Sequence, residues 1–188
     1  MREIRLDEAV NIQRKSAPAE TIKSGSLVIG LENVVPYEGI LELPDPIVEK
    51  VRSNKTYFQQ GDILFGKLRP NLRKVVVAPI NGFCTTELIV LRAIDERDTW
   101  YIWNLLRGVT FAKSINSLIA GASLPRISPR DLLSIEIAWP DEKQRFKISK
   151  QAEILHNTKV NLRNLQKLVA DADSALSLSQ HLDSKVVE

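Results

Sequence analysis

The distribution of glycine and proline is the feature that most restricts the fold of this chain. All eight glycines and all nine prolines lie at or before Pro140, and residues 141–188 contain neither. Both residue types interrupt regular structure, so the first part must be divided by turns, whereas the last part can form one uninterrupted helix. The sequence therefore predicts a domain over residues 1–140 and a long helix over residues 141–188.

Apolar residues recur at intervals of seven along the predicted helix. The repeat is made by Ile148, Leu155, Leu162, Val169 and Leu176, joined three residues after a repeat position by Leu165 and Ala172. This is the spacing of a coiled-coil seam, so we expect these residues to form a dimer interface. A helix that lies across its own domain is the alternative. The arm is favoured because about 40 helical residues extend roughly 60 Å, further than such a domain is wide.

The composition excludes several classes of protein. The chain has 188 residues, a net charge of +3 and a pI of about 9.0, which permits nucleic acid as a partner without requiring it. A single cysteine, Cys84, excludes a disulfide framework, and with only two histidines a metal site is not expected. We find no signal peptide and no apolar run long enough to span a membrane, so we expect a cytoplasmic protein without a cofactor.

The first part of the chain alternates short β-rich runs with short helical segments. Strands are expected at residues 26–31, 62–65, 74–78, 83–91 and 134–139, with a hairpin turn at Asn81-Gly82, and helical segments at residues 99–107, 110–119 and 128–133. The expected fold class is therefore α+β. It comprises a curled, mainly antiparallel sheet with short helices, followed by one long coiled-coil helix.

The segment from Gly61 to Lys74 carries the strongest functional signal. After Asp62 it contains no acidic residue and five polar side chains that suit DNA: Lys67, Arg69, Asn71, Arg73 and Lys74. If a strand ran into a turn at 69–71, residues 67, 69, 71 and 73 would share one face. Arginine and lysine bind guanine or phosphate, and asparagine pairs with adenine. The alternative is a solvated turn whose charges keep an edge strand soluble.

A second cationic cluster lies further along the chain. It comprises Lys113 and the Gly-, Ser- and Pro-containing segment 121–130, with Ser123, Arg126 and Arg130 as candidate phosphate donors. The alternative is a plain connector into the last strand. Catalysis by Cys84 is not expected, because a nucleophilic cysteine needs a paired base and both histidines lie in the predicted helix.

Four segments together resemble a known family. They are residues 61–75 (GDILFGKLRPNLRKV), 82–92 (GFCTTELIVLR), 121–132 (GASLPRISPRDL) and 135–144 (IEIAWPDEKQ), in that order and followed by the long helix. The chain resembles a target recognition domain, with its spacer helix, of the specificity (S) subunit of type I restriction–modification systems. One departure is small: Trp139-Pro140 replaces a Pro-Pro pair of the family.

The resemblance implies a function for the chain. It implies sequence-specific binding of double-stranded DNA at a bipartite site, without catalysis, on behalf of DNA adenine methyltransferase (M) and restriction (R) subunits. Those partners, and not this subunit, use S-adenosylmethionine, ATP and magnesium. An S subunit of the family has two recognition domains and two antiparallel spacer helices, so the resemblance implies a half-size form that pairs as an antiparallel homodimer. Two alternatives remain: a coiled-coil adaptor that binds only protein, and the recognition domain of a fused restriction–methylation enzyme.

Overall fold

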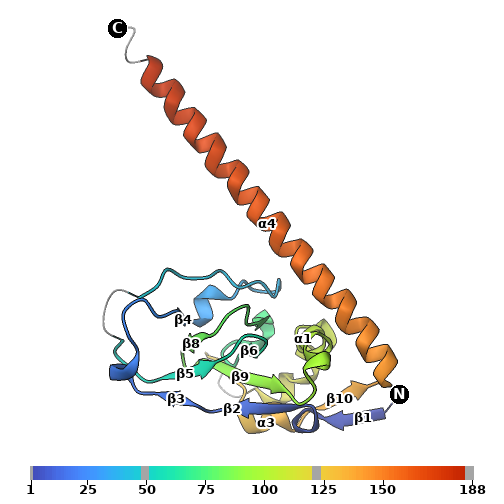
Figure 1. Ribbon diagram of the computed structural model, residues 1–188. Helices are drawn as coiled ribbons and strands as arrows, with labels where there is room; N and C mark the ends of the chain where they lie inside the picture. Colours follow the sequence, from blue (N-terminus) through green and yellow to red (C-terminus); the bar gives the residue numbers. More distant parts are fainter. Residues whose placement is uncertain (1, 48–50, 120–123, 185–188) are drawn as a thin grey trace. The chain divides into compact units, whose positions relative to one another are not determined.

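The computed structural model describes residues 2–47, 51–119 and 124–184, with side chains up to residue 176. The chain divides into two compact units, residues 1–152 and residues 153–188. The first unit holds all the strands and all the short helices (Figure 1). In the second unit, the described residues 153–184 continue one long helix.

The strands of the first unit are β1 (Arg2–Arg5), β2 (Val10–Gln13), β3 (Ser16–Ala17), β4 (Val28–Ile29), β5 (Lys55–Phe58), β6 (Ile63–Gly66), β7 (Val75–Val77), β8 (Gly82–Cys84), β9 (Leu88–Ala93) and β10 (Glu136–Trp139). The α-helices are α1 (Thr99–Leu106), α2 (Val109–Ser114), α3 (Pro129–Leu133) and α4 (Glu142–Ser184). Single 3-10 turns are η1 (Leu6–Glu8), η2 (Ala19–Thr21), η3 (Leu31–Asn33), η4 (Pro70–Leu72), η5 (Glu96–Asp98) and η6 (Asn116–Leu118).

The strands form three small sheets. Their orders are β1-β10, β2-β9-β6-β7 and β3-β5-β8-β4, and every pairing is antiparallel except that of β4 with β8. The expected α+β class, with mainly antiparallel sheets, short helices and a long final helix, is confirmed.

The central sheet β2-β9-β6-β7 is buried on both faces. Along β6, Ile63 and Phe65 belong to one apolar cluster and Leu64 to the other, and Val75 and Val76 divide in the same way along β7. The first cluster includes α1, whose Trp103 Nε1 donates to the Val75 carbonyl at 3.0 Å. Burial on both faces explains why these strands read as continuous apolar runs without polar alternation.

The predicted hairpin at Asn81-Gly82 is wrong. β7 pairs with β6, whereas β8 pairs with β5 and β4 in a different sheet. The expected strand 83–91 is therefore two strands, β8 and β9, separated by a turn in which the Leu88 N–H donates to the Thr85 carbonyl at 3.1 Å. A local turn signal cannot show that the chain changes sheets at this point.

Two of the expected helical segments form as predicted. The expected helix 99–107 is α1, and the segment 128–133 forms α3 with Pro129 in its first turn. The Ser128 hydroxyl caps α3, because its Oγ accepts from the Asp131 N–H at 3.0 Å.

The long helix α4 begins as the sequence predicts, directly after Asp141. The carboxylate of Asp141 accepts from the Gln144 N–H at 2.8 Å and so caps the helix. However, the first compact unit extends to residue 152, beyond the predicted boundary at Pro140. Ala152 is buried in the core, and Ile148 packs against it. Ile148, predicted to be in the dimer seam, is therefore used by its own domain.

Candidate nucleic-acid interface

The first basic segment is a turn and not an extended strand. β6 ends at Gly66, Arg69 and Arg73 both have a left-handed backbone with φ of 50°, and η4 lies between them. The prediction that strand alternation places residues 67, 69, 71 and 73 on one face is therefore wrong. Asn71 and the two arginines are presented by a tight turn, in which Pro70 is buried.

The second basic segment pairs with this turn. The Arg69 N–H donates to the Pro125 carbonyl at 2.7 Å, and the Ile127 N–H donates to the Lys67 carbonyl at 3.0 Å. Leu68 and Arg126 form an isolated antiparallel bridge. Two basic stretches almost sixty residues apart in sequence are thus held side by side by the backbone.

A third segment joins them from α2, which contacts η4. The Phe111 ring of α2 packs edge-on against Phe65 of β6, with 6.4 Å between the ring centroids. This packing holds α2 beside the basic turn, and Lys113 is exposed on α2. Three segments therefore bring cationic side chains to one region of the first unit.

The predicted DNA-binding residues do not all have the same role. Arg69, Asn71, Lys113 and Arg126 are exposed, and Lys67 is half-buried. The ammonium group of Lys74 is used within the domain, since its Nζ donates to the Leu31 carbonyl at 2.7 Å.

The predicted DNA-binding residues also include Arg130 and Ser123. Arg130 is exposed on α3, which packs on η1. Ser123 lies outside the described residues.

Glu87 is an acidic residue within this basic region. Its carboxylate lies 3.3 Å from the Arg126 guanidinium, and the Lys67 N–H donates to its main-chain carbonyl at 3.0 Å. Arg126 is half exposed, so this is a weak ion pair that leaves the guanidinium accessible. The sequence contained no signal for this contact, because Glu87 and Arg126 lie on different segments.

Cys84 lies on β8 in the interior of the first unit. Its side chain is fully buried in the apolar cluster that also contains Leu64 and Val76. Burial, and to a lesser extent the charge of Asp62, raise the pKa of the Cys84 thiol to about 12. A thiol with this pKa is not a nucleophile near neutral pH.

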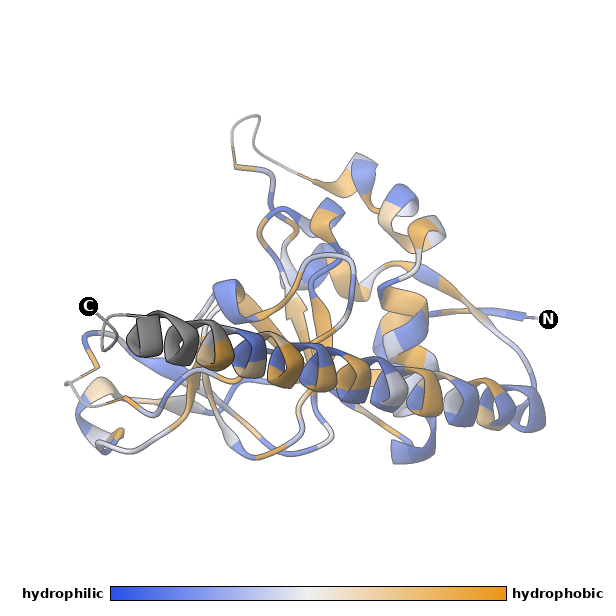
Figure 2. Ribbon diagram, turned by 90° about the horizontal axis from the view of Figure 1, so that it is seen from above, coloured by the Kyte–Doolittle hydropathy of each residue, from blue (hydrophilic) through white to orange (hydrophobic). Residues whose placement is uncertain are grey.

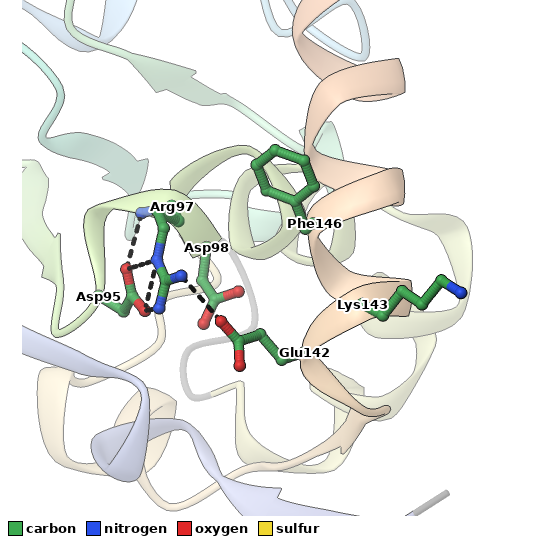
Figure 3. Close-up of a pocket in the computed structure, with 6 residues that line it drawn as sticks. All are labelled: Asp95, Arg97, Asp98, Glu142, Lys143 and Phe146. Carbon is green, nitrogen blue, oxygen red and sulfur yellow. Dashed lines mark hydrogen bonds and ion pairs between the residues drawn. The ribbon is translucent and has the colours of Figure 1, made fainter.

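The start of α4 forms a small pocket with η5, shown in Figure 3. The pocket has a volume of about 380 Å³ and is lined by Asp95, Arg97, Asp98, Glu142, Lys143 and Phe146. Arg97 joins Asp95 at 2.6 Å and Glu142 at 2.8 Å. The Arg97–Glu142 pair links η5 to the first turn of α4, so the pocket lies where the helix leaves its own domain.

Within the residues that the structure describes, no group of three or more histidine, cysteine or acidic side chains is arranged to hold a metal ion. In the same residues, no helix is both long enough and apolar enough to cross a membrane.

Comparison with protein-family models finds no match. Among curated proteins, the type I restriction enzyme EcoDI specificity subunit of Escherichia coli is 28% identical over 119 residues, which is 63% of this chain and 25% of that protein. The HsdS subunit of Thermoanaerobacter tengcongensis has the same fold, with a TM-score of 0.67 and 21% identity over 87% of this chain and 44% of the other.

A second solved chain has a similar fold. It comes from a structure concerned with complex assembly and conformational transition of the type I R-M system, with a TM-score of 0.68 and 21% identity over 91% of this chain and 45% of that one. The matched region spans a quarter of the curated relative and less than half of each solved chain. These comparisons confirm the resemblance to type I specificity subunits that the sequence motifs indicate.

Proposed function

We propose that the first unit recognises double-stranded DNA through the region formed by the turn 67–73, the segment 124–127 and α2. One observation carries this proposal: the Arg69–Pro125 and Lys67–Ile127 hydrogen bonds unite basic segments that are remote in sequence. The exposed cations that this arrangement gathers would attract the phosphates of a duplex. An adaptor that binds only protein has no need of this arrangement.

The exposed side chains are of two kinds, one suited to bases and one suited to phosphates. Arg69, Arg126 and Asn71 have the planar donor groups that pair bidentately with bases. Lys67 and Lys113 are better suited to phosphate, which a point charge can bind without a fixed geometry. The rigid turn around Pro70 would hold the base-reading groups in register on a duplex.

Binding to DNA is tested by fluorescence anisotropy on labelled duplexes enriched by the full chain from a random-sequence pool. If the full binding surface neutralises about five phosphates, log K should fall with log salt at a slope of about −4 to −5. Failure to enrich any duplex, or binding that is insensitive to salt, would refute the proposal.

Single substitutions then separate the two classes of contact. Arg69→Ala should weaken binding to the enriched duplex by about 5- to 100-fold and change binding to a scrambled duplex much less, whereas Lys113→Ala should weaken both alike. Lys143→Ala, an exposed lysine on the first turn of α4, is the matched control and should leave both affinities unchanged. If Arg69→Ala and Lys143→Ala behave identically, the interface is wrongly placed.

The chain is further proposed to act as the specificity component of a type I restriction–modification system, without catalysis of its own. The similarity to the EcoDI specificity subunit supports this role. In this role it would direct methyltransferase and restriction subunits to a bipartite site. Co-purification with the adenine methyltransferase of the same system, and methylation dependent on this chain, would test the assignment.

The exposed face of α4 is proposed to pair with a second copy of the chain in antiparallel orientation. Leu155, Leu162, Leu165, Val169 and Leu176 are each about half exposed or more, and Ala172 lies on the same repeat. Apolar residues recur along α4 (Figure 2). An apolar stripe of this length is unfavourable in water and is normally covered.

Light scattering tests this pairing, with about twice 21.2 kDa expected for the full chain. Leu162→Asp should dissociate the dimer because it introduces a charge into the seam. Asn164→Asp adds the same charge on another face of the helix and should leave the dimer intact. A monomer at tens of micromolar, or equal effects of the two variants, would contradict the proposed pairing.

A further inference from the structure

A turn that the sequence analysis did not single out lies against the basic turn. In this second turn the Val35 N–H donates to the Ile40 carbonyl at 2.9 Å, and Tyr37 has a left-handed backbone with φ of 65°. Tyrosine rarely adopts this conformation, because its Cβ approaches the backbone closely. Its N–H donates to the Leu72 carbonyl of η4 at 2.9 Å, which holds Tyr37 beside the basic turn.

Left-handed backbone is concentrated at this junction. Within the described residues, the non-glycine residues with positive φ are Tyr37, Arg69 and Arg73. Two of them flank η4, and the third is hydrogen-bonded to it. Such backbone conformations persist only where the surroundings enforce them, and they gather at functional sites.

Cation–π contacts and hydrogen bonds connect the side chains at this junction. The Arg73 guanidinium carbon lies 5.1 Å from the centre of the Tyr37 ring, and Arg73 Nη1 donates to the Arg107 carbonyl at 3.4 Å. Arg107 Nη2 donates to the Tyr37 carbonyl at 3.1 Å, and its guanidinium carbon lies 4.5 Å from the Trp103 ring. Arg107 and Tyr37 thus hold Arg73 from two sides.

Gly39 makes this packing possible. Its φ is +70°, and a Cβ at this position would lie 2.6 Å from Trp103 Cζ2 and 2.9 Å from Arg107 Nε. The turn can therefore approach α1 closely only with glycine here. Tyr37 as a whole is 48% exposed, and its ring contacts Arg73.

The lowered pKa of Arg107 is consistent with its position close to Arg73. Burial lowers the pKa of Arg107, and the nearby charge of Arg73 lowers it further. The two guanidinium groups therefore repel each other, and an anion brought to this junction would relieve that repulsion.

We propose that Tyr37 is a positioning residue of the DNA-contacting surface, whose ring fixes the direction of the Arg73 guanidinium so that it contacts one defined group on the duplex. The inference rests on the DNA-binding function proposed above. A guanidinium held in place before binding loses less rotamer freedom on binding and discriminates better between correctly and wrongly placed acceptors. Tyr37 should therefore affect selectivity more than general affinity for DNA.

The test measures binding of full-length variants to the enriched duplex and to a scrambled duplex of equal length. Tyr37→Leu should weaken the first by ~10-fold and the second by no more than about 3-fold. Tyr37→Phe keeps the ring and should bind as the wild type does. Tyr57→Leu, which removes the stack of Tyr57 with Lys15 at 4.9 Å in another part of the domain, should leave selectivity unchanged.

A double-mutant cycle separates positioning from a structural role. In an Arg73→Ala background, Tyr37→Leu should have no further effect on selectivity, because the group that it directs is absent. Should Tyr37→Leu fold poorly, Arg73→Lys provides the same test, since lysine keeps the charge but loses the planar stack and should reduce selectivity alike. Additive effects, or wild-type selectivity in Tyr37→Leu, would overturn the inference. If the wild type enriches no duplex, the proposed function fails first and the inference falls with it.

Discussion

The start of α4 offers a direct measure of what anchors the long helix to its domain. Arg145 is largely buried, with 13% of its side chain exposed, and its Nε lies 2.9 Å from the carboxylate of Asp98, itself 8% exposed. Arg145 Nη1 donates to the Pro140 carbonyl at 2.8 Å, and the guanidinium carbon lies 4.4 Å from the Trp139 ring. Substituting Arg145→Ala removes all three contacts and leaves Asp98 as a buried carboxylate without its cation.

Removing one partner of a buried ion pair lowers the free energy of unfolding by about 3–5 kcal/mol. For a domain of roughly 150 residues, this corresponds to a decrease in Tm of roughly 6–20 °C. Arg97→Ala is the matched control. Arg97 also pairs with acidic residues near the start of α4, Asp95 and Glu142 (Figure 3), but 59% of its side chain is exposed to water. Its loss should shift the Tm little, since solvent screens exposed ion pairs.

Differential scanning calorimetry and urea unfolding measure both variants. A second substitution, Asp98→Asn in the Arg145→Ala background, should recover part of the lost stability, because it removes the uncompensated buried charge. Equal Tm values for Arg145→Ala and Arg97→Ala would show that burial does not decide the strength of these pairs. A lack of any recovery in the double variant would show that the stack on Trp139 matters more than the ion pair.

Two further results are expected. Glu87→Gln should tighten binding to any duplex by about 2- to 5-fold in anisotropy titrations, because it removes a negative charge from the basic surface and releases Arg126; weaker binding would show that Glu87 itself contacts DNA. Unfolding free energy should fall as the pH rises above 9, by up to about 1.4 kcal/mol per pH unit, because the raised pKa of Cys84 makes its thiolate form in the unfolded chain first. Cys84→Ala should reduce this slope in urea titrations between pH 8 and 10.5, leaving the smaller contribution of Tyr101, whose pKa burial also raises. An unchanged slope would mean that the thiol is accessible in the folded protein.

The sequence alone determined the features that depend on local chemistry. The absence of glycine and proline after Pro140 predicted α4, and the Ser128-Pro129 pair predicted the capped helix α3. Both signals act within one turn of a helix, so no distant contact is needed to realise them. The motifs that carry the family resemblance are likewise contiguous stretches of sequence.

The tertiary structure decided which segments meet. The periodicity of α4 cannot show that Ile148 packs on the core of its own domain, because Ile148 occupies the same heptad position as the exposed Leu155. The Asn81-Gly82 turn carries a hairpin signature, yet the strands on either side of it belong to different sheets. Local propensity specifies a conformation, whereas pairing is selected by how much apolar surface the whole fold buries.

At the candidate interface too, some features follow from the sequence and others only from tertiary packing. Sequence reasoning found the basic side chains of residues 67–73 and 124–127, but the pairing of the two segments depends on backbone hydrogen bonds over nearly sixty residues. Neither Tyr37 nor Arg107 lies in a basic run, and only the tertiary fold brings them to Arg73. The Tyr37 N–H donates to the Leu72 carbonyl, and Arg107 lies against Trp103. The sequence therefore determined the chemistry of this surface, and tertiary packing decided its geometry.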